Sequence, residues 1–258
     1  MDSFEYKKSL GQNFLRDNNI IDKIVDSSNI DKNTLVIEIG PGDGALSKRI
    51  VPLCGHAILY EIDTRLKDKL NELLANYNNY EIIFGDFLKQ DITLISKNYE
   101  KVYVIANLPY YITTAIITKL MKELIPDKMI VMMQDEVADR ISAMPGNREY
   151  GMISVLINSM YDVDKMFKVS RNSFVPVPNV DSAVVKLEKN DKLCGVPFLK
   201  FEEFIMDAFQ FKRKNLRNNL KKYDLNLIQE ILSKNNYSLS DRAEDIPVNV
   251  FIEIVRNI

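Results

Sequence analysis

Apolar runs rich in β-branched residues alternate with helical patterns over the first two thirds of the chain. Five runs have the length and composition of buried strands, namely residues 34–39, 56–62, 80–84, 102–106 and 128–134. Between them, leucine and isoleucine recur at helical spacing, for example in residues 66–74 and 116–124. Strands that alternate with helices form βαβ units, so this pattern predicts a parallel sheet with helices on both faces.

Two more strand-like segments follow Met160, VDKMFKV and SAVVKL, joined by the proline-bearing FVPVPNV. This connection is too short for a helical crossover, so we expect an antiparallel hairpin at the edge of the sheet. EKNDKLCGVPF then reads as a linker, and only helical patterning remains from Leu199 onward. The sequence therefore predicts an α/β domain over residues 1–189, with a mostly parallel seven-stranded sheet, and a small all-α domain over residues 190–258.

The composition argues against several classes of protein. Cys54 and Cys194 have no paired spacing and His56 is the single histidine, so we expect neither a disulfide framework nor a metal site. No apolar run approaches the length of a membrane span, and the N-terminus lacks the apolar region of a signal peptide. We therefore expect a cytoplasmic protein with no membrane contact. Because the net charge is −2, a nucleic acid would have to bind at a local basic patch.

Polar or glycine-rich sequences follow the predicted strands at their carboxyl ends, where open parallel sheets bind ligands. The first strand leads into EIGPGDG, which includes Gly40 and Gly42 and has the spacing G-x-G-x-G, unlike the dinucleotide fingerprint G-x-G-x-x-G. A tight turn is the alternative interpretation. The second strand ends at Glu61, which is placed to accept hydrogen bonds from ribose hydroxyls, or else simply precedes a helix with Asp63.

The next two strands end in the same way. Asp86 in GDF is placed to accept a hydrogen bond from an amine, and Asn107 opens the sequence NLPYY. Polar residues at the ends of successive strands form a constellation that chance explains poorly. The sequence thus predicts a nucleotide-like ligand at this edge of the sheet.

At this point the sequence resembles a known family. SLGQNFL, NLPYYIT, QDEVADRISAMPGNREYG, FVPVPNVDSAVV and FKRKNLRNNL are similar, in this order, to blocks of the bacterial ribosomal RNA adenine dimethyltransferases, the kasugamycin-sensitivity family. The resemblance extends from Ser9 to RAEDIP near the end of the chain. It implies a Rossmann-like class I methyltransferase fold with S-adenosylmethionine as methyl donor. Asn13 favours the bacterial branch, since archaeal and eukaryotic relatives often carry histidine there.

NLPYY suggests how such an enzyme would treat an exocyclic adenine amine, whose lone pair is delocalised into the ring. The side-chain oxygen of Asn107 and the main-chain carbonyl of Leu108 would accept its two hydrogens and localise the lone pair. Pro109 would fix the turn, and Tyr110 would supply a face on which a flipped base stacks. The resemblance implies that Phe174 closes on the other face of the base. The alternative for both rings is a purely structural role in the core.

Each part of the methyl donor has an expected partner. The loop with Gly40 and Gly42 would contact the methionine portion, Glu61 the ribose and Asp86 the adenine amine. The resemblance adds Asn107, together with Asn13 and Leu15 of the N-terminal segment, which would close over the donor. Asn107 would therefore serve both the donor and the target base.

A basic segment near the C-terminus, FKRKNLRNNLKK, supplies the local patch that the net charge requires. Its cations are Lys212, Arg213, Lys214, Arg217, Lys221 and Lys222. At helical spacing Arg213, Arg217 and Lys221 would form one stripe, which we expect to bind RNA phosphates. The alternative is a solvated helix face.

The resemblance implies an enzyme that dimethylates the N6 amine of two adjacent adenosines in the 3′-terminal hairpin loop of small-subunit ribosomal RNA. We expect a monomer that acts on an immature small subunit. Two alternatives remain open: a large-subunit methyltransferase of the antibiotic-resistance type, and a non-catalytic nucleic-acid-binding relative. The complete set of C-terminal blocks argues against the first, and the intact NLPY and Glu61 argue against the second.

Overall fold

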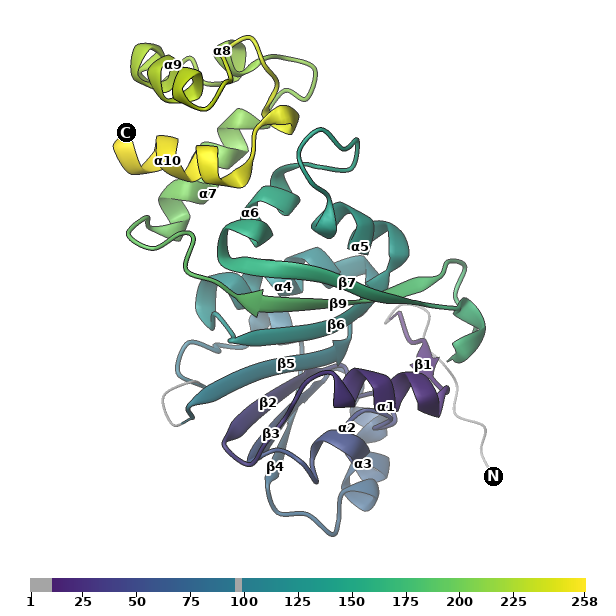
Figure 1. Cartoon of the computed structure of the whole chain (residues 1–258). Coiled ribbons are helices and arrows are strands. Elements are labelled where there is room, and N and C mark those ends of the chain that lie inside the picture. Colours follow the sequence, from purple (N-terminus) through teal and green to yellow (C-terminus); the bar gives the residue numbers. More distant parts are fainter. Residues whose placement is uncertain (1–10, 96–98) are drawn as a thin grey trace. The chain divides into compact units, whose positions relative to one another are not determined.

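Parallel strands bring their carboxyl ends to one edge of a sheet in the computed structural model, which describes residues 11–95 and 99–258. Ser9 and Leu10, the first residues of the SLGQNFL block, lie outside the described residues. Seven strands of the described chain form one sheet in the order β4-β3-β2-β5-β6-β9-β7 (Figure 1). Their bounds are β2 Thr34–Ile39, β3 His56–Glu61, β4 Tyr80–Phe84, β5 Lys101–Asn107, β6 Lys128–Gln134, β7 Tyr161–Val169 and β9 Ser182–Lys189.

The registers align the carboxyl ends of neighbouring strands. β2 to β6 pair in parallel, with Glu38 opposite Leu59, Glu61 opposite Phe84 and Asn107 opposite Met132. β9 and β7 are the last two strands in the order of the sheet and run in opposite directions (Figure 1). Only a single turn of 3-10 helix at Arg171–Ser173 and the short strand β8 (Phe174–Val175) separate them in the sequence. The predicted mostly parallel α/β sheet with an antiparallel edge hairpin is therefore confirmed.

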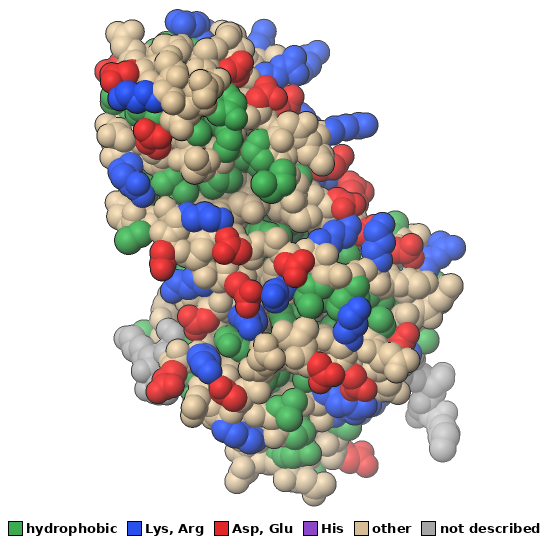
Figure 2. All heavy atoms as spheres, viewed as in Figure 1, with side chains coloured by type: hydrophobic (Ala, Val, Ile, Leu, Met, Phe, Trp, Pro, Cys, Tyr) green, Lys and Arg blue, Asp and Glu red, His purple; other side chains and the backbone are tan. Residues whose placement is uncertain are grey.

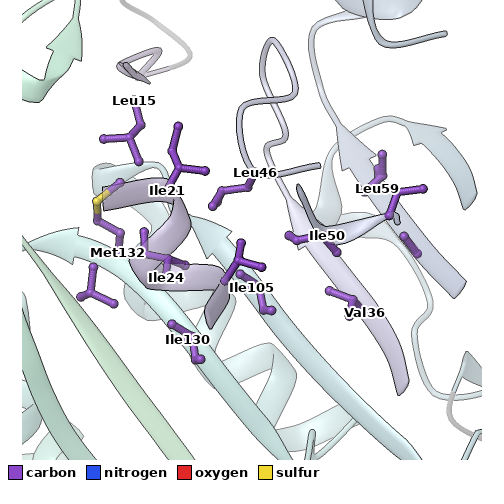
Figure 3. Close-up of a cluster of buried hydrophobic side chains, with 14 of the residues drawn as sticks. Leu15, Ile21, Ile24, Val36, Leu46, Ile50, Leu59, Ile105, Ile130 and Met132 are labelled. Carbon is purple, nitrogen blue, oxygen red and sulfur yellow. The ribbon is translucent and has the colours of Figure 1, made fainter. Parts of the chain in front are cut away.

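Helices cover both faces of this sheet (Figure 1). On one face lie α1 (Asn18–Asp26) and α2 (Ser47–Ile50), and α4 (Thr113–Glu123) lies on the other. The remaining helices along the sheet are α3 Lys67–Leu73 and α5 Asp135–Ser142. Figure 3 shows the core beneath α1 and α2, which joins Ile21, Ile24, Leu46, Ile50, Val36, Leu59, Ile105 and Ile130.

Side chains alternate along the strands, and this decides which residues lie at the carboxyl ends of β2 and β5 on the face covered by α1 and α2. Val36 and Ile105 both belong to the core cluster under α1 and α2. Glu38 and Asn107 follow them by two positions on β2 and β5, and alternate residues of a strand share one face of a sheet. The same face therefore changes from apolar core to polar groups as the strands end.

A short second sheet ties the N-terminal segment to the FVPVP block. β1 (Phe14–Leu15) pairs antiparallel with β8 (Phe174–Val175), with Leu15 opposite Phe174. The main-chain N–H of Arg16 also donates to Ser173 O at 2.8 Å. Because these partners are far apart in the sequence, this pairing was not predicted.

Contacts divide the chain into two compact units, the first extending to Ala138 with Lys165–Leu187 and the second comprising Asp139–Asp164 with Glu188–Ile258. The second unit is mainly helical, apart from the start of β7 and the end of β9. Its helices are α6 Met152–Met160, α7 Phe198–Ala208, α8 Leu216–Asn219, α9 Leu225–Lys234 and α10 Val248–Asn257. Its core holds a chain of aromatic rings, in which Phe204 contacts Phe251 and Tyr223. The domain boundary expected at residue 189 stays a prediction.

The basic segment differs from its predicted form. Residues 212–222 do not make one helix, because α8 covers only Leu216–Asn219. Asn215 begins this helix by accepting a hydrogen bond from Asn218 N with its side chain, and Leu216 and Leu220 are buried. The amide of Asn219 donates to Ala208 O at 2.7 Å, which holds the preceding turn in place. The expected helical stripe of Arg213, Arg217 and Lys221 is therefore wrong as secondary structure.

Candidate active site

A cavity opens where β2, β3 and β5 end. We call it the strand-end cavity, and its volume is about 60 Å³. The strands and the turn after β5 contribute Gly40, Glu61, Asn107, Leu108, Pro109 and Tyr110, and residues 11–14 complete the lining. The structure thus brings together predicted residues from four separate parts of the sequence.

Two further cavities adjoin it, because they share lining residues with it. The loop cavity includes Leu15, Glu38 and Asp43, and shares Gly40, Gly42, Phe14 and Asn107 with the strand-end cavity. The Asp86 cavity includes Tyr60, Asp86 and Leu88, and shares Gly40, Ile62 and Pro109. Gly40 lines all three, so the cavities form one region along the carboxyl ends of the strands.

Glu61 is buried, and main-chain donors hold its carboxylate. Gly42 N donates to Oε2 at 2.9 Å and Asp63 N donates to Oε1 at 2.8 Å. Burial raises the pKa of this carboxyl, and the two N–H donors oppose that shift. Glu61 therefore fixes the loop after β2 as well as lining the strand-end cavity. Each carboxylate oxygen of Glu61 has a further lone pair, and these two acceptors could bind a diol.

The glycines after β2 are required by the backbone. Gly40 has φ +72° and Gly42 has φ +60°, conformations that side chains other than glycine rarely adopt. A Cβ on Gly42 would lie 2.9 Å from Cε1 of Phe14, so the Phe14 ring packs directly on this glycine. A Cβ on Gly40 would meet no atom within 4 Å, since it would point into open space. The loop is thus a tight turn that also lines the cavities.

Asn107 is held by the N-terminal segment. Its Nδ2 donates to the main-chain oxygen of Asn13 at 3.0 Å. Because the amide nitrogen is used in this way, Oδ1 is left as the acceptor, and no described residue donates to it. The predicted acceptor atom is therefore available beside the cavity.

The turn after Asn107 is equally constrained. Leu108 N donates to Met132 O at 3.0 Å, which continues the pairing of β5 with β6 beyond the end of the strand. Pro109 O accepts hydrogen bonds from Ile112 N at 3.2 Å and from the Thr113 hydroxyl at 3.0 Å. These contacts give residues 107–110 one conformation at the cavity.

Tyr110 is partly buried, and its hydroxyl lies 2.7 Å from Oγ of Ser182. Burial raises the pKa of the Tyr110 phenol, so it stays neutral. Ser182 is the first residue of β9 and is fully buried. A ring with a fixed hydroxyl keeps a fixed face, which suits stacking of a planar ligand.

Phe174 differs from its expected position. Its side chain is only 1% exposed and belongs to the core cluster with Leu15, Ile21 and Ile24. Pairing of β8 with β1 places it in this core, and it does not line the strand-end cavity. This position agrees with the structural alternative, and the expected contact of Phe174 with the base stays a prediction. Leu15 shares this core and reaches the loop cavity, and Asn13 contributes its carbonyl to Asn107.

Four residues around the cavities were not singled out from the sequence. Glu38, Phe14 and Asp43 line the loop cavity, and Ser182 holds Tyr110. Glu38 could have been found, because it precedes Gly40 by two positions on a predicted strand. Asp43 forms ion pairs with Arg16 and, at 3.4 Å, with Lys69, and these contacts between distant segments leave no local signal.

The basic segment lies in the second unit. Arg213, Arg217 and Lys221 are exposed, and no described acidic residue pairs with them. Lys212 and Lys214 are exposed as well. Lys222 differs, because its Nζ lies 2.7 Å from Asp207 and 3.0 Å from Glu203, and these acids raise its pKa.

Comparison with known proteins decides the family. The sequence matches the family described as ribosomal RNA adenine dimethylase over residues 3–258. This chain belongs to that family. Ribosomal RNA small subunit methyltransferase A of Bacillus thuringiensis (strain Al Hakam) is 41% identical over 261 residues, which covers 96% of this chain and 89% of the relative. The protein of the same name from Bacillus mycoides (strain KBAB4) is 40% identical over 265 residues, with the same coverage of both chains.

Two solved structures are similar to this protein over nearly the whole chain. A dimethyladenosine transferase from Plasmodium falciparum superposes with a TM-score of 0.79 at 25% identity, covering 93% of this chain and 95% of that one. The 23S rRNA methyltransferase ErmE gives a TM-score of 0.76 at 25% identity, covering 94% and 98%. The fold is thus a Rossmann-like methyltransferase fold, and the family activity is methyl transfer to ribosomal RNA adenine.

The chemistry of the lining fits the methyl donor. Carboxylates at Glu61 and Asp86 suit a diol and an amine, and the carboxyl-rich loop cavity suits a cation. The described residues hold no group of three or more histidine, cysteine or acidic side chains arranged to bind a metal ion. Over the same residues, no helix is long and apolar enough to cross a membrane.

Proposed function

We propose that this protein transfers methyl groups from S-adenosylmethionine to the N6 amine of two adjacent adenosines in the 3′-terminal hairpin loop of small-subunit ribosomal RNA. The observation that carries the proposal is the state of Asn107, whose amide nitrogen is engaged by Asn13 while its oxygen remains an unused acceptor at the cavity. That arrangement serves an amine that presents two hydrogens.

The residues of the NLPY turn would activate the amine by position alone. Oδ1 of Asn107 and the main-chain oxygen of Leu108 accept its hydrogens and draw the nitrogen toward tetrahedral geometry, which localises the lone pair. These acceptors are preorganised by the contacts of Asn107 with Asn13 and of Leu108 with Met132, so little reorganisation is needed during the reaction. No general base is needed before attack, because the ammonium that forms is strongly acidic.

The donor would lie along the three adjoining cavities. When bound, S-adenosylmethionine supplies a methyl group on a positively charged sulfur. Glu61 would hold the ribose and Asp86 the adenine amine, and the loop with Gly40 and Gly42 would pass close to the methionine portion. Residues 13–15 would cover the donor, while Tyr110 offers its fixed face to the flipped target base.

The second unit would supply RNA affinity. The exposed cations at residues 212–214, 217 and 221 would contact phosphates without reading sequence. The two relatives named small subunit methyltransferase A favour the small subunit as substrate. We infer that the protein acts as a monomer on immature small subunits in the cytoplasm, with residues 190–258 as an RNA-binding domain.

The test is to incubate the protein with labelled S-adenosylmethionine and isolated, unmodified small subunits, and then to digest the RNA to nucleosides. We expect label in N6,N6-dimethyladenosine, with up to four methyl groups per subunit because two adenosines each accept two. Similarity to ErmE makes the large subunit the second candidate, so isolated large subunits are assayed in parallel. Label only in the large subunit would replace the proposal, and no label in either would favour a non-catalytic RNA-binding protein.

A further inference from the structure

Residues 11–13 of the N-terminal segment connect two sides of the strand-end cavity, and all three line it. On one side, the main-chain oxygen of Asn13 accepts the hydrogen bond from Asn107 Nδ2 at 3.0 Å. On the other side, Gln12 Nε2 donates to Asp63 Oδ2 at 2.7 Å. The transfer chemistry above does not use Gln12, so this contact requires an explanation.

Asp63 is a fixed acceptor for Gln12. Its side chain is 2% exposed, and the guanidinium of Arg65 donates to it from Nη2 at 2.6 Å and from Nε at 2.9 Å. The hydrogen bonds from Arg65 hold the pKa of Asp63 below its usual range, burial opposes this, and the hydrogen bond from Gln12 lowers the pKa further. Asp63 N also donates to Glu61 Oε1 at 2.8 Å, so Gln12 is anchored to the carboxyl end of β3.

The carbonyl of Asn13 is held from both directions along the chain. After it, β1 begins at Phe14 and pairs with β8. Before it, Gly11 contacts the ring of Tyr111, which is 60% exposed, and the Asn13 side chain donates back to Gly11 O at 3.3 Å. Neither of these contacts ties the segment to a buried group. Gln12 supplies such a tie, because its partner is a buried carboxylate.

The position of this carbonyl decides which way the amide of Asn107 faces. The oxygen and nitrogen ends of an amide have nearly the same size, so hydrogen bonds distinguish the two orientations. With Nδ2 bonded to Asn13 O, the acceptor Oδ1 is left for the target amine. A reversed amide would present N–H groups to an amine that also presents N–H groups, and it could not activate that amine.

We propose that Gln12 is a positioning residue of the transfer reaction. Its hydrogen bond to Asp63 holds the Asn13 carbonyl in place, and this carbonyl in turn orients the amide of Asn107. The two halves of the site are thereby linked, since Asp63 also contacts Glu61 at the donor side. The inference rests on the proposed function, because it concerns the acceptor of the target amine.

Single-turnover methylation of unmodified small subunits by Gln12→Ala tests the proposal. At saturating donor and RNA the rate should fall about tenfold, because a hydrogen bond to a charged acceptor is lost. Calorimetric donor affinity should stay within a few-fold, since Arg65 still holds Asp63 and Asp63 N still holds Glu61. An unchanged rate would overturn the proposal. A donor Kd that rises as much as the rate falls would assign Gln12 to donor binding and overturn it as well.

A double-mutant cycle separates positioning from a general effect on the fold. In an Asn107→Ala background no amide remains to be oriented, so adding Gln12→Ala should change the rate by less than about twofold. A purely structural role would lower the rate by the same factor in both backgrounds, and that result would overturn the inference. Gln12→Glu keeps the size of the side chain but removes the donor, and it should repeat both results.

Gln90→Ala is the matched control. Gln90 is also a partly buried glutamine near the donor side, but its Nε2 donates to the main-chain oxygen of Asp86 at 3.5 Å. This variant should methylate at the wild-type rate, and a loss as large as that of Gln12→Ala would overturn the proposal. Absence of methylation by the unaltered protein would instead remove the proposed function on which the inference rests.

Discussion

A single hydrogen bond fixes which atom of the Asn107 side chain is left to accept at the strand-end cavity. Its Nδ2 donates to the carbonyl of Asn13, a residue of the N-terminal segment, and this leaves Oδ1 as an acceptor. An acceptor pair of Oδ1 and the Leu108 carbonyl suits an amine with two hydrogens, and it would not suit a hydroxyl or a thiol. In the proposed mechanism, this one amide therefore sets the choice of nucleophile.

Asn107→Ala should separate chemistry from RNA binding. The change removes one of two preorganised acceptors, and loss of one such group costs on the order of a hundredfold in turnover. RNA affinity should stay within a few-fold, because phosphate contacts are expected elsewhere. Single-turnover methylation and filter binding of the same subunits measure the two effects. A variant that methylates at nearly the wild-type rate would refute the proposed role of the amide.

Glu38 should make the stability of the protein depend on pH. Burial raises its pKa to about 8 in the folded protein, against about 4.5 when unfolded, so between these values the folded state binds more protons. The contribution of Glu38 to the free energy of unfolding should therefore be fully present below pH 4.5. It should fall by up to about 1.4 kcal/mol per pH unit as the pH rises to 8. Glu38→Gln lacks this titration, so its stability relative to the wild type should increase over that window. Urea unfolding at pH 5, 6.5 and 8 checks the slope, and parallel curves would contradict it.

At the scale of elements, the loop after β2 contributes both to the fold and to the lining of the cavities. A comparison of Gly40 in this loop with Gly146 elsewhere can separate the two contributions. Gly40 and Gly146 have φ of +72° and +79°, and a Cβ at either would meet no atom within 4 Å. Alanine at either position should cost a similar amount of stability, about 1–2 kcal/mol from the left-handed backbone. Gly40 lines all three adjoining cavities, so only Gly40→Ala should also weaken S-adenosylmethionine binding. Equal donor affinities of the two variants would exclude Gly40 from the cradle.

Local pattern was sufficient for the sheet and for most of the strand ends. Alternating strands and helices, and a polar residue after each strand, are short-range features, so Gly40, Glu61 and Asn107 could be predicted to meet at one edge. The β1–β8 pairing could not, because Phe14 and Val175 lie on segments that no local pattern relates. That pairing places Phe174 in the core and Phe14 against Gly42, which explains why the expected role of Phe174 differs from its position.

In the basic segment, local pattern predicted a helix that the structure does not contain. The spacing of its basic residues is compatible with one helix. Instead, Asn215 caps a new short helix, and Asn219 donates to Ala208 O. Capping and side-chain contacts to the main chain compete with helix propensity, and a charge pattern alone does not reveal them. The cations remained exposed even though the predicted helix was wrong.

For the whole molecule, charge is dispersed rather than concentrated. The net charge is −2, and Figure 2 shows basic and acidic side chains interspersed over the visible face. A protein of this kind has no long-range attraction for RNA, so affinity has to come from a few cations without acidic neighbours. Arg213, Arg217 and Lys221 meet this condition among the described residues, whereas Lys222 is held by Asp207 and Glu203.

Changing Arg213, Arg217 and Lys221 together to glutamine should weaken binding to small subunits and make it less dependent on salt. If each cation releases one counterion from RNA, the log–log slope of affinity against salt should fall by roughly two to three. The fold should persist, since glutamine is compatible with a helix at residue 217 and the other two positions lie outside α8. Lys222→Gln is the control: it should lower the melting temperature through the lost contacts with Asp207 and Glu203, and change the slope by at most about one. An unchanged slope in the triple variant would assign these residues to solvent and leave the RNA-binding surface to be found elsewhere.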